Sequence, residues 1–117
     1  MSEQINWIKV ADFISDIPFN DDHLAEVTAD GKRICLAHYK EQIYAFAARC
    51  PHASGQLAHG FIDALGNVVC PLHRYQFCMK NGRNVTGEGY YLKHWPVKVN
   101  EAGVFVGLDA KSLMGLF

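Results

Sequence analysis

The stretch that decides the fold runs from residue 50 to residue 73 and reads CPHASGQLAHGFIDALGNVVCPLH. It begins with Cys50-Pro51-His52 and ends with Cys70-Pro71-Leu72-His73, so each end supplies one thiol and one imidazole. Residues 53–69 separate the two runs. Thiolates and imidazoles bind zinc and iron well, so this pattern predicts two similar loops that clamp one metal centre from opposite sides.

Each run contains both a cysteine and a histidine, and this mixing favours one type of metal centre over another. Zinc sites with two cysteines and two histidines usually place both thiols in one knuckle and both imidazoles in another. A binuclear iron-sulfur cluster explains the mixing if one iron takes both thiolates and the other takes both imidazoles. Zinc, or two unrelated surface pairs, are the alternatives. The candidate metal and cofactor ligands are Cys50, His52, Cys70 and His73.

Formal charge explains why this ligand set suits electron transfer. Two ferric ions, two sulfides and two thiolates sum to zero when both imidazoles are neutral, whereas four thiolates leave the core two units more negative. An electron is added more easily to the neutral core, which places the reduction potential at about −150 to +300 mV. With His52 and His73 at the loop tips, the imidazole end becomes the expected exit for the electron and the docking point for a partner.

The remaining sequence predicts an all-β chain, because short β-branched and aromatic runs alternate with turn residues and no helical periodicity persists. Early strands are expected over residues 5–10, 23–29, 32–39 and 43–47, with reversals at Asp30-Gly31 and Lys40-Glu41-Gln42 and an irregular stretch over residues 12–22.

The later elements are expected around the second ligand run and near the end of the chain. Val68-Val69 leads into that run, residues 74–79 continue away from it, and Asn81-Gly82 predicts a tight hairpin. Four valines are expected to form one core face across a turn at residues 100–103: Val97, Val99, Val104 and Val106.

Composition limits the partners and the location. The chain has 117 residues, which fits one domain, and its 11 basic and 12 acidic side chains give a net charge of −1, which argues against a nucleic-acid partner. Residues 1–6 lack the basic and apolar run of an export signal, and no apolar stretch is long enough to span a bilayer. We therefore expect a cytoplasmic protein without a membrane partner, in which cysteines bind metal rather than form disulfides.

From about Trp7 to Leu108 the chain resembles a Rieske-type ferredoxin of the soluble bacterial branch. The resemblance is carried by the two ligand runs, the pattern Gly55-x-Leu57-x-x-Gly60-Phe61, the aromatics Tyr75 and Phe77, and the segment Trp95-Pro96-Val97-Lys98-Val99. It implies a β-sandwich or barrel of antiparallel strands with a small cluster-binding subdomain at about residues 48–80, all within a single domain over residues 1–117.

The resemblance also implies a function. Soluble bacterial members of this family hold a Rieske 2Fe-2S cluster and carry single electrons from a flavin-dependent reductase to a terminal oxygenase. A non-catalytic electron-transfer component is therefore expected, since the chain shows no nucleotide-binding loop, no nucleophile with its base and no mononuclear iron triad. The alternatives are the small subunit of an assimilatory nitrite reductase or other multicomponent oxidoreductase, and a zinc-stabilised binding module.

Departures from respiratory Rieske proteins bear on the potential. Those proteins join their cluster loops by a disulfide whose cysteines would fall at Gly55 and Leu72, and they place hydroxyl donors at positions that hold Tyr75 and Phe77 here. Phe77 cannot donate a hydrogen bond, and fewer donors to sulfur stabilise the reduced cluster less. We therefore expect a potential near the lower end of the range. Arg74, where many relatives have glycine, either favours an acidic partner or points into water.

Other reactive side chains are expected to be structural. Cys35 lies in an apolar strand-like run and is expected in the core, and Cys78 is expected to be structural although it lies close to the second ligand run. His59 is expected to be a solvated loop residue, and three histidines without ligand spacing are expected to be structural or surface residues: His23, His38 and His94. The apolar tail at residues 109–117 is expected to pack on the sandwich or to fray, and an exposed tail would indicate a protein contact.

Overall fold

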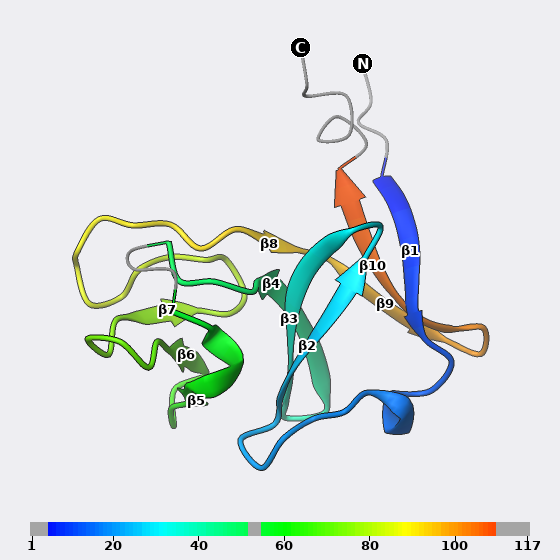
Figure 1. Ribbon diagram of the computed structural model, residues 1–117, viewed down its shortest axis with the longest axis horizontal. Coiled ribbons are helices and arrows are strands. Elements are labelled where there is room, and N and C mark those ends of the chain that lie inside the picture. Colours follow the sequence, from blue (N-terminus) through cyan, green and yellow to red (C-terminus); the bar gives the residue numbers. More distant parts are fainter. Residues whose placement is uncertain (1–4, 52–54, 110–117) are drawn as a thin grey trace.

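The structure is a computed structural model that describes residues 5–51 and 55–109 (Figure 1). The chain forms three antiparallel sheets. The first, in the order β1-β10-β9, contains β1 (Ile5–Ala11), β10 (Gly103–Asp109) and β9 (Val97–Asn100). The second, in the order β2-β3-β4-β8, contains β2 (Leu24–Ala29), β3 (Lys32–Tyr39), β4 (Gln42–Ala47) and β8 (His94–Trp95). The third, in the order β5-β6-β7, contains β5 (Phe61–Ile62), β6 (Asn67–Val69) and β7 (Gln76–Cys78).

Helical structure in the described residues is confined to two single turns of 3-10 helix, η1 (Ile14–Asp16) and η2 (Leu57–His59). The all-β prediction is therefore confirmed, and η1 falls in the stretch that was expected to be irregular. No helix of the described ranges is long and apolar enough to cross a membrane.

The turns of the second sheet follow from their residue types. Asp30 and Gly31 have φ of 52° and 79°, and Lys40 and Glu41 have φ of 51° and 65°. Two consecutive positive φ values are what a two-residue hairpin loop needs to match the twist of its strands. Both reversals are thus confirmed, and β3 has the predicted bounds, although Gln42 begins β4 rather than ending the turn.

Strand β3 is buried on both faces, which explains its continuous apolar run. Ile34 and Leu36 point into a core shared with Val104, Val106 and other residues of the first sheet. Their neighbours Cys35 and Ala37 alternate to the opposite face, where they meet the small third sheet. The second sheet is therefore the middle layer, with a different core on each side.

The small third sheet belongs to an excursion of the chain between β4 and β8. Residues 48–93 leave the second sheet after Ala47 and return beside it, where the Ala47 amide donates to the Lys93 carbonyl at 2.9 Å and Phe46 pairs with His94. Figure 1 shows this excursion as a lobe beside the two larger sheets. Cys50 and the second ligand run, residues 70–73, lie in this lobe.

Two of the expected local features differ in the structure. Asn81-Gly82 does not form a tight two-residue hairpin: the Cys78 amide donates to the Arg83 carbonyl at 2.8 Å, so residues 79–82 form a wider turn. Val99 pairs with Val104 as expected but is 49% exposed, because it lies near the end of the edge strand β9. Val104 and Val106 alone are fully buried among the four valines.

Candidate metal centre

Backbone hydrogen bonds join the described residues on either side of the first ligand run. The Cys50 amide donates to the Gly55 carbonyl at 2.8 Å, and the Leu57 amide donates to the Ala48 carbonyl at 2.9 Å. These bonds turn the Cys50 side chain inward, where only 2% of its surface is exposed. His52 lies outside the described residues, so its place in the site stays a prediction.

The second ligand loop follows directly from β6. The Cys70 amide donates to the Tyr75 carbonyl at 2.9 Å, which closes a turn over residues 71–74. His73 and Arg74 have φ of 64° and 59°, a left-handed conformation that costs non-glycine residues free energy. The turn leaves Cys70 fully buried and both His73 and Arg74 exposed. His73 therefore lies in an exposed turn, and its role as a ligand stays a prediction.

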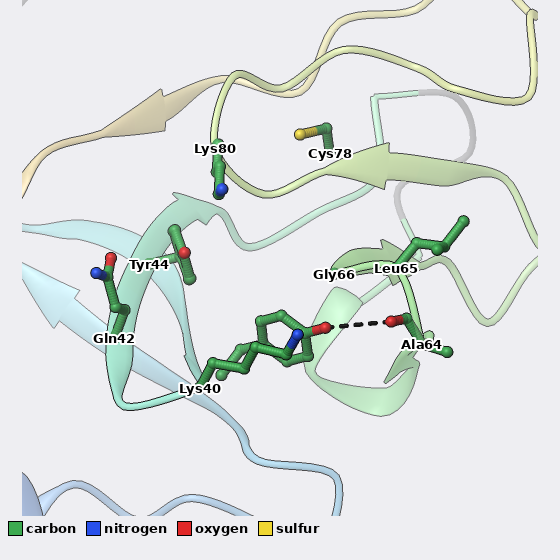
Figure 2. A pocket seen from close by; sticks show the side chains of 9 residues that line it. Lys40, Gln42, Tyr44, Ala64, Leu65, Gly66, Cys78 and Lys80 are labelled. Carbon is green, nitrogen blue, oxygen red and sulfur yellow. Dashed lines mark hydrogen bonds between the residues drawn. The ribbon is translucent and has the colours of Figure 1, made fainter.

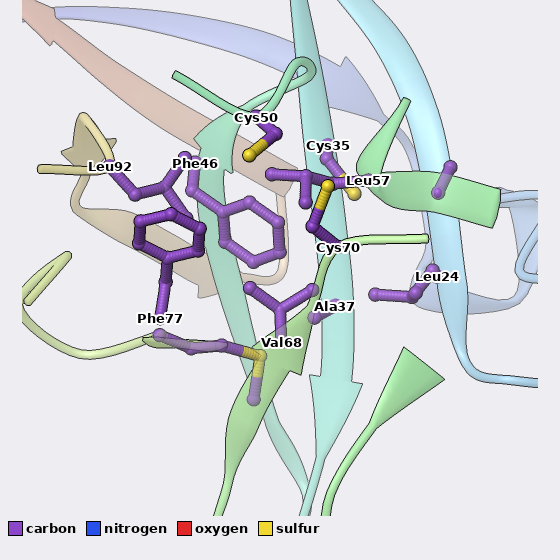
Figure 3. Close-up of a cluster of buried hydrophobic side chains, with 12 residues drawn as sticks. Leu24, Cys35, Ala37, Phe46, Cys50, Leu57, Val68, Cys70, Phe77 and Leu92 are labelled. Atoms are coloured by element: carbon purple, nitrogen blue, oxygen red, sulfur yellow. The ribbon is translucent and has the colours of Figure 1, made fainter. Parts of the chain in front are cut away.

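The two thiols lie together inside the lobe core. Cys50 and Cys70 share one buried cluster with Leu57 and Phe77, and Figure 3 shows both sulfur atoms in this apolar space. Burial raises the pKa of Cys70 to about 11; the Leu72 backbone N–H lowers it, whereas a hydrogen bond and charge repulsion from Cys50 raise it. A metal ion that binds here must displace the thiol proton, and its positive charge then compensates two thiolates in an apolar core.

Two glycines let the ligand loops approach each other. A Cβ at Gly55 would lie 3.1 Å from the Leu72 Cγ and 3.2 Å from the Cys70 Sγ. Gly55 and Leu72 are therefore neighbours in space, as expected of positions that hold a disulfide in respiratory Rieske proteins. A Cβ at Gly60 would lie 1.9 Å from the Val69 carbonyl oxygen, so only glycine allows η2 to end against the strand that delivers Cys70.

A third loop lines the site, which sequence reasoning did not anticipate. The ring centroids of His73 and Tyr75 are 6.2 Å apart, and Tyr75 in turn lies 5.9 Å from Tyr90. The loop that carries Tyr90 is held by Thr86, whose hydroxyl accepts from the Gln76 amide at 3.2 Å. The available signal was the aromatic pair Tyr90-Tyr91 after a glycine-rich stretch, but nothing in its spacing pointed to the ligand runs.

The described part of the site fits an iron-sulfur centre, although it does not form a complete ligand set. No group of three or more His, Cys, Asp or Glu side chains in the described ranges has metal-binding geometry. Cys50, Cys70 and His73 are all described and do not form such a group, whereas a binuclear cluster would hold its thiolates on one iron and its imidazoles on the other. Two thiols buried together and one imidazole exposed on the same pair of loops are the donors that a cluster with unlike ends requires.

The remaining reactive side chains occupy the roles expected of them. Cys35 is fully buried, and burial raises its pKa to about 12. Cys78 is half-buried at the far end of β7. His59 and His23 are exposed, whereas the half-buried rings of the other two contact aromatic neighbours: His38 lies 5.5 Å from Phe19, and His94 interacts with the Tyr91 hydroxyl at 3.1 Å.

Comparison with known families identifies the class of protein. Residues 6–95 match the Rieske 2Fe-2S domain, so the chain belongs to the Rieske family. The chain is similar to the 3-phenylpropionate/cinnamic acid dioxygenase ferredoxin subunit of Photorhabdus laumondii subsp. laumondii, with 28% identity over 94 residues that cover 80% of this chain and 87% of the relative.

Solved structures agree with this assignment. The complex of reduced oxygenase and oxidized ferredoxin in carbazole 1,9a-dioxygenase contains a chain with 25% identity and a TM-score of 0.72, matched over 86% of this protein and 92% of that chain. A nitrite reductase NADPH small-subunit protein shares the fold at 23% identity with a TM-score of 0.74, over 86% and 97% of the two chains.

The family and its ferredoxin relatives define cofactor and activity. The cofactor is a Rieske-type 2Fe-2S cluster, and the protein is an electron carrier. The zinc alternative left open by the ligand runs is therefore wrong.

Proposed function

We propose that this ferredoxin passes single electrons from a flavin-dependent reductase to a terminal oxygenase. The observation that carries the proposal is the asymmetry of the site, in which two thiols are buried while the His73 turn is exposed. An electron carrier needs such an arrangement, because one end of the cluster must be shielded and the other must approach a partner. The likeness to a dioxygenase ferredoxin subunit supports the oxygenase as acceptor.

The four predicted ligands have distinct roles in this proposal. Cys50 and Cys70 hold the buried iron as thiolates, and His52 and His73 hold the outer iron as neutral imidazoles. The bound cluster supplies one-electron redox chemistry, and the protein contributes burial, orientation and a limited number of hydrogen-bond donors. Phe77 packs with both cysteines without offering a donor, which supports a potential near the lower end of the Rieske range.

The exposed side chains around His73 form the proposed docking face. Leu72 and Tyr90 are large exposed hydrophobic residues, and Arg74 adds an exposed positive charge next to the imidazole. Aromatic residues and arginine are enriched in protein interfaces, and one cation favours an acidic partner surface. A small face of this kind suits a transient encounter, which fast electron delivery requires.

We also propose the organisation and location of the chain. Residues 1–117 act as a single Rieske domain in which about residues 48–80 bind the cluster, within the excursion between β4 and β8. A cytoplasmic location is supported by the free thiols of Cys35 and Cys78, which persist in reducing compartments.

The second candidate function is that of the small subunit of an assimilatory nitrite reductase, and the fold shared with such a protein supports it. The two functions differ in the permanence of the complex. A shuttling ferredoxin purifies alone and is reduced by a separate flavin reductase, whereas a reductase subunit copurifies with a much larger chain. Affinity capture from native cells, followed by reduction assays with the captured flavoprotein or oxygenase, separates them. Stable capture of a nitrite reductase would contradict the shuttle.

Substitution of one ligand tests the cluster assignment. His73→Cys adds a thiolate, so a cluster-loaded variant is expected to keep the fold and to have a lower midpoint potential. His59→Cys is the matched control, because His59 is exposed on η2 and is not a predicted ligand. An unchanged midpoint in cluster-loaded His73→Cys would show that His73 does not bind iron.

A further inference from the structure

A second concave site lies where the small lobe meets the middle sheet, at the opposite end of the lobe from the ligand loops. This junction pocket has a volume of about 500 Å³ and is lined by Tyr39, Lys40, Gln42 and Tyr44 from the middle sheet and by residues 64–66, 78 and 80 from the lobe. Figure 2 shows that its labelled side chains come from both parts of the fold. A pocket of this size accommodates a small organic molecule.

The charge of the junction pocket is positive. Lys40 and Lys80 line it from opposite parts of the fold, and none of its described lining residues is acidic. Two acidic residues flank the lining in sequence: Asp63, whose carboxylate accepts from the Leu65 amide at 2.8 Å within its own turn, and Glu41, which lines a different groove. Two ammonium groups without a carboxylate between them attract an anion.

One wall of the pocket is aromatic and fixed in place. The Tyr39 hydroxyl donates to the Ala64 carbonyl at 3.2 Å, which ties the ring across the junction (Figure 2). Gly66, with φ of +86°, lets the ring approach, since a Cβ there would lie 3.1 Å from the Tyr39 Cε2. The Lys40 Nζ lies 5.4 Å from the centroid of the same ring. A flat apolar surface and a positive charge are thus adjacent before any ligand binds.

We propose that the junction pocket binds a small organic carboxylate that carries a flat apolar group. The carboxylate interacts with Lys40 and Lys80, and the flat group packs against the rings of Tyr39 and Tyr44. The site is separate from the metal centre, because Gly66 precedes Cys70 by the length of β6, roughly 13 Å of extended chain. Binding therefore does not depend on the proposed donor or acceptor of electrons.

The test is a titration of the oxidised holoprotein with benzoate, followed by two-dimensional NMR of the backbone amides. We expect saturable shifts at Lys40, Gln42, Leu65 and Lys80. Acetate lacks the flat group and benzyl alcohol lacks the charge, so each is expected to bind at least about fivefold more weakly. Lys40→Met and Lys80→Met are each expected to weaken benzoate binding about two- to fivefold, the effect of one exposed ion pair.

Lys32→Met is the matched control, because it removes the same charge at the other end of β3, roughly 23 Å of extended chain from Tyr39. It is expected to leave benzoate binding unchanged, and the visible spectrum of the cluster is expected to stay the same in all three variants. Absence of saturable shifts, or equal loss of binding in Lys32→Met, would overturn the proposal. Saturable binding of a hexa-aspartate peptide without binding of benzoate would also overturn it, in favour of an acidic protein partner.

Discussion

Replacement of Gly60 by alanine adds a single methyl group and is expected to disturb the cluster site. The position of Gly60 is set by η2, which ends at Gly60 with a hydrogen bond from the Gly60 amide to the Leu57 carbonyl at 2.9 Å. A Cβ at this position would lie 1.9 Å from the Val69 carbonyl oxygen and 3.1 Å from the carbonyl carbon. Since both contacts are with backbone, no side-chain rotation relieves them.

In Gly60→Ala, the backbone at Val69 or at the end of η2 must therefore move by roughly 1 Å. Overpacking of this kind costs about 1 to 3 kcal/mol, and a rigid backbone contact belongs at the upper end of that range. For a domain of this size, a loss of about 2 to 3 kcal/mol lowers Tm by roughly 10 °C. Because Val69 directly precedes Cys70, the shift also moves a predicted ligand, and we expect fewer iron atoms per protein chain.

The assay combines thermal unfolding with the iron and acid-labile sulfide content of anaerobically purified protein. Gly31→Ala is the matched control, because Gly31 has φ of +79° and a Cβ at that position would meet no other part of the chain within 4 Å. That variant is expected to lose about 1 to 2 kcal/mol from left-handed strain and to keep its full iron content. The reasoning is refuted if Gly60→Ala retains both the iron content and the Tm of the wild-type protein.

Three further predictions concern the potential and the titratable groups. Cluster-loaded Phe77→Tyr is expected to raise the midpoint potential in a redox titration by some tens of millivolts, because it introduces a hydroxyl beside the cysteines. An unchanged or lower midpoint potential would contradict the argument that the wild-type site lacks a hydrogen-bond donor at this position. Iodoacetamide at pH 8 is expected to label Cys78 and to spare Cys35, as peptide mass spectrometry can check. Because burial raises the pKa of Cys35 to about 12 from an ordinary 9.0, this thiol is also expected to lower the stability as pH rises through that interval, an effect absent in Cys35→Ala. Burial alone would raise the pKa of Asp63, but the N–H groups of its turn lower this pKa on balance. The stability that the Asp63 carboxylate contributes is therefore expected to be lost in acid, below the ordinary pKa of 3.8. Asp63→Ala removes these hydrogen bonds and is expected to lower the free energy of unfolding by about 1 to 3 kcal/mol, as measured by urea unfolding at pH 7.

The predictions that succeeded rest on local chemistry. The positive φ values at Asp30-Gly31 and Lys40-Glu41 follow from turn residues, and the bounds of β3 follow from a short run between two such turns. The prediction of a tight hairpin at Asn81-Gly82 failed for a reason outside that dipeptide. A Cβ at Gly82 would lie 1.9 Å from the Leu92 carbonyl oxygen, so the glycine serves a close approach to a distant segment.

At the metal centre too, local features could be predicted from the sequence and distant contacts could not. The sequence predicts Cys50, His52, Cys70 and His73 as ligands from residue type and spacing, and the structure buries Cys50 and Cys70 together. The sequence did not identify Tyr90, which reaches the site through Tyr75, because that contact depends on how residues 84–92 return to the lobe. Nor did it predict the junction pocket, whose walls come from strands that are distant in sequence.

By itself, the sequence determined the type of cofactor, the redox class and the alternation of strands and turns, and it predicts the ligands. Each of these depends on the identity of a few residues and on their spacing, which folding does not change. Tertiary structure alone decided that Cys50 and Cys70 lie in one core, that Tyr90 stands beside Tyr75, and where two lysines and two tyrosines come together. These properties depend on the packing of the lobe against β3, and packing brings into contact residues whose separation along the chain carries no signal.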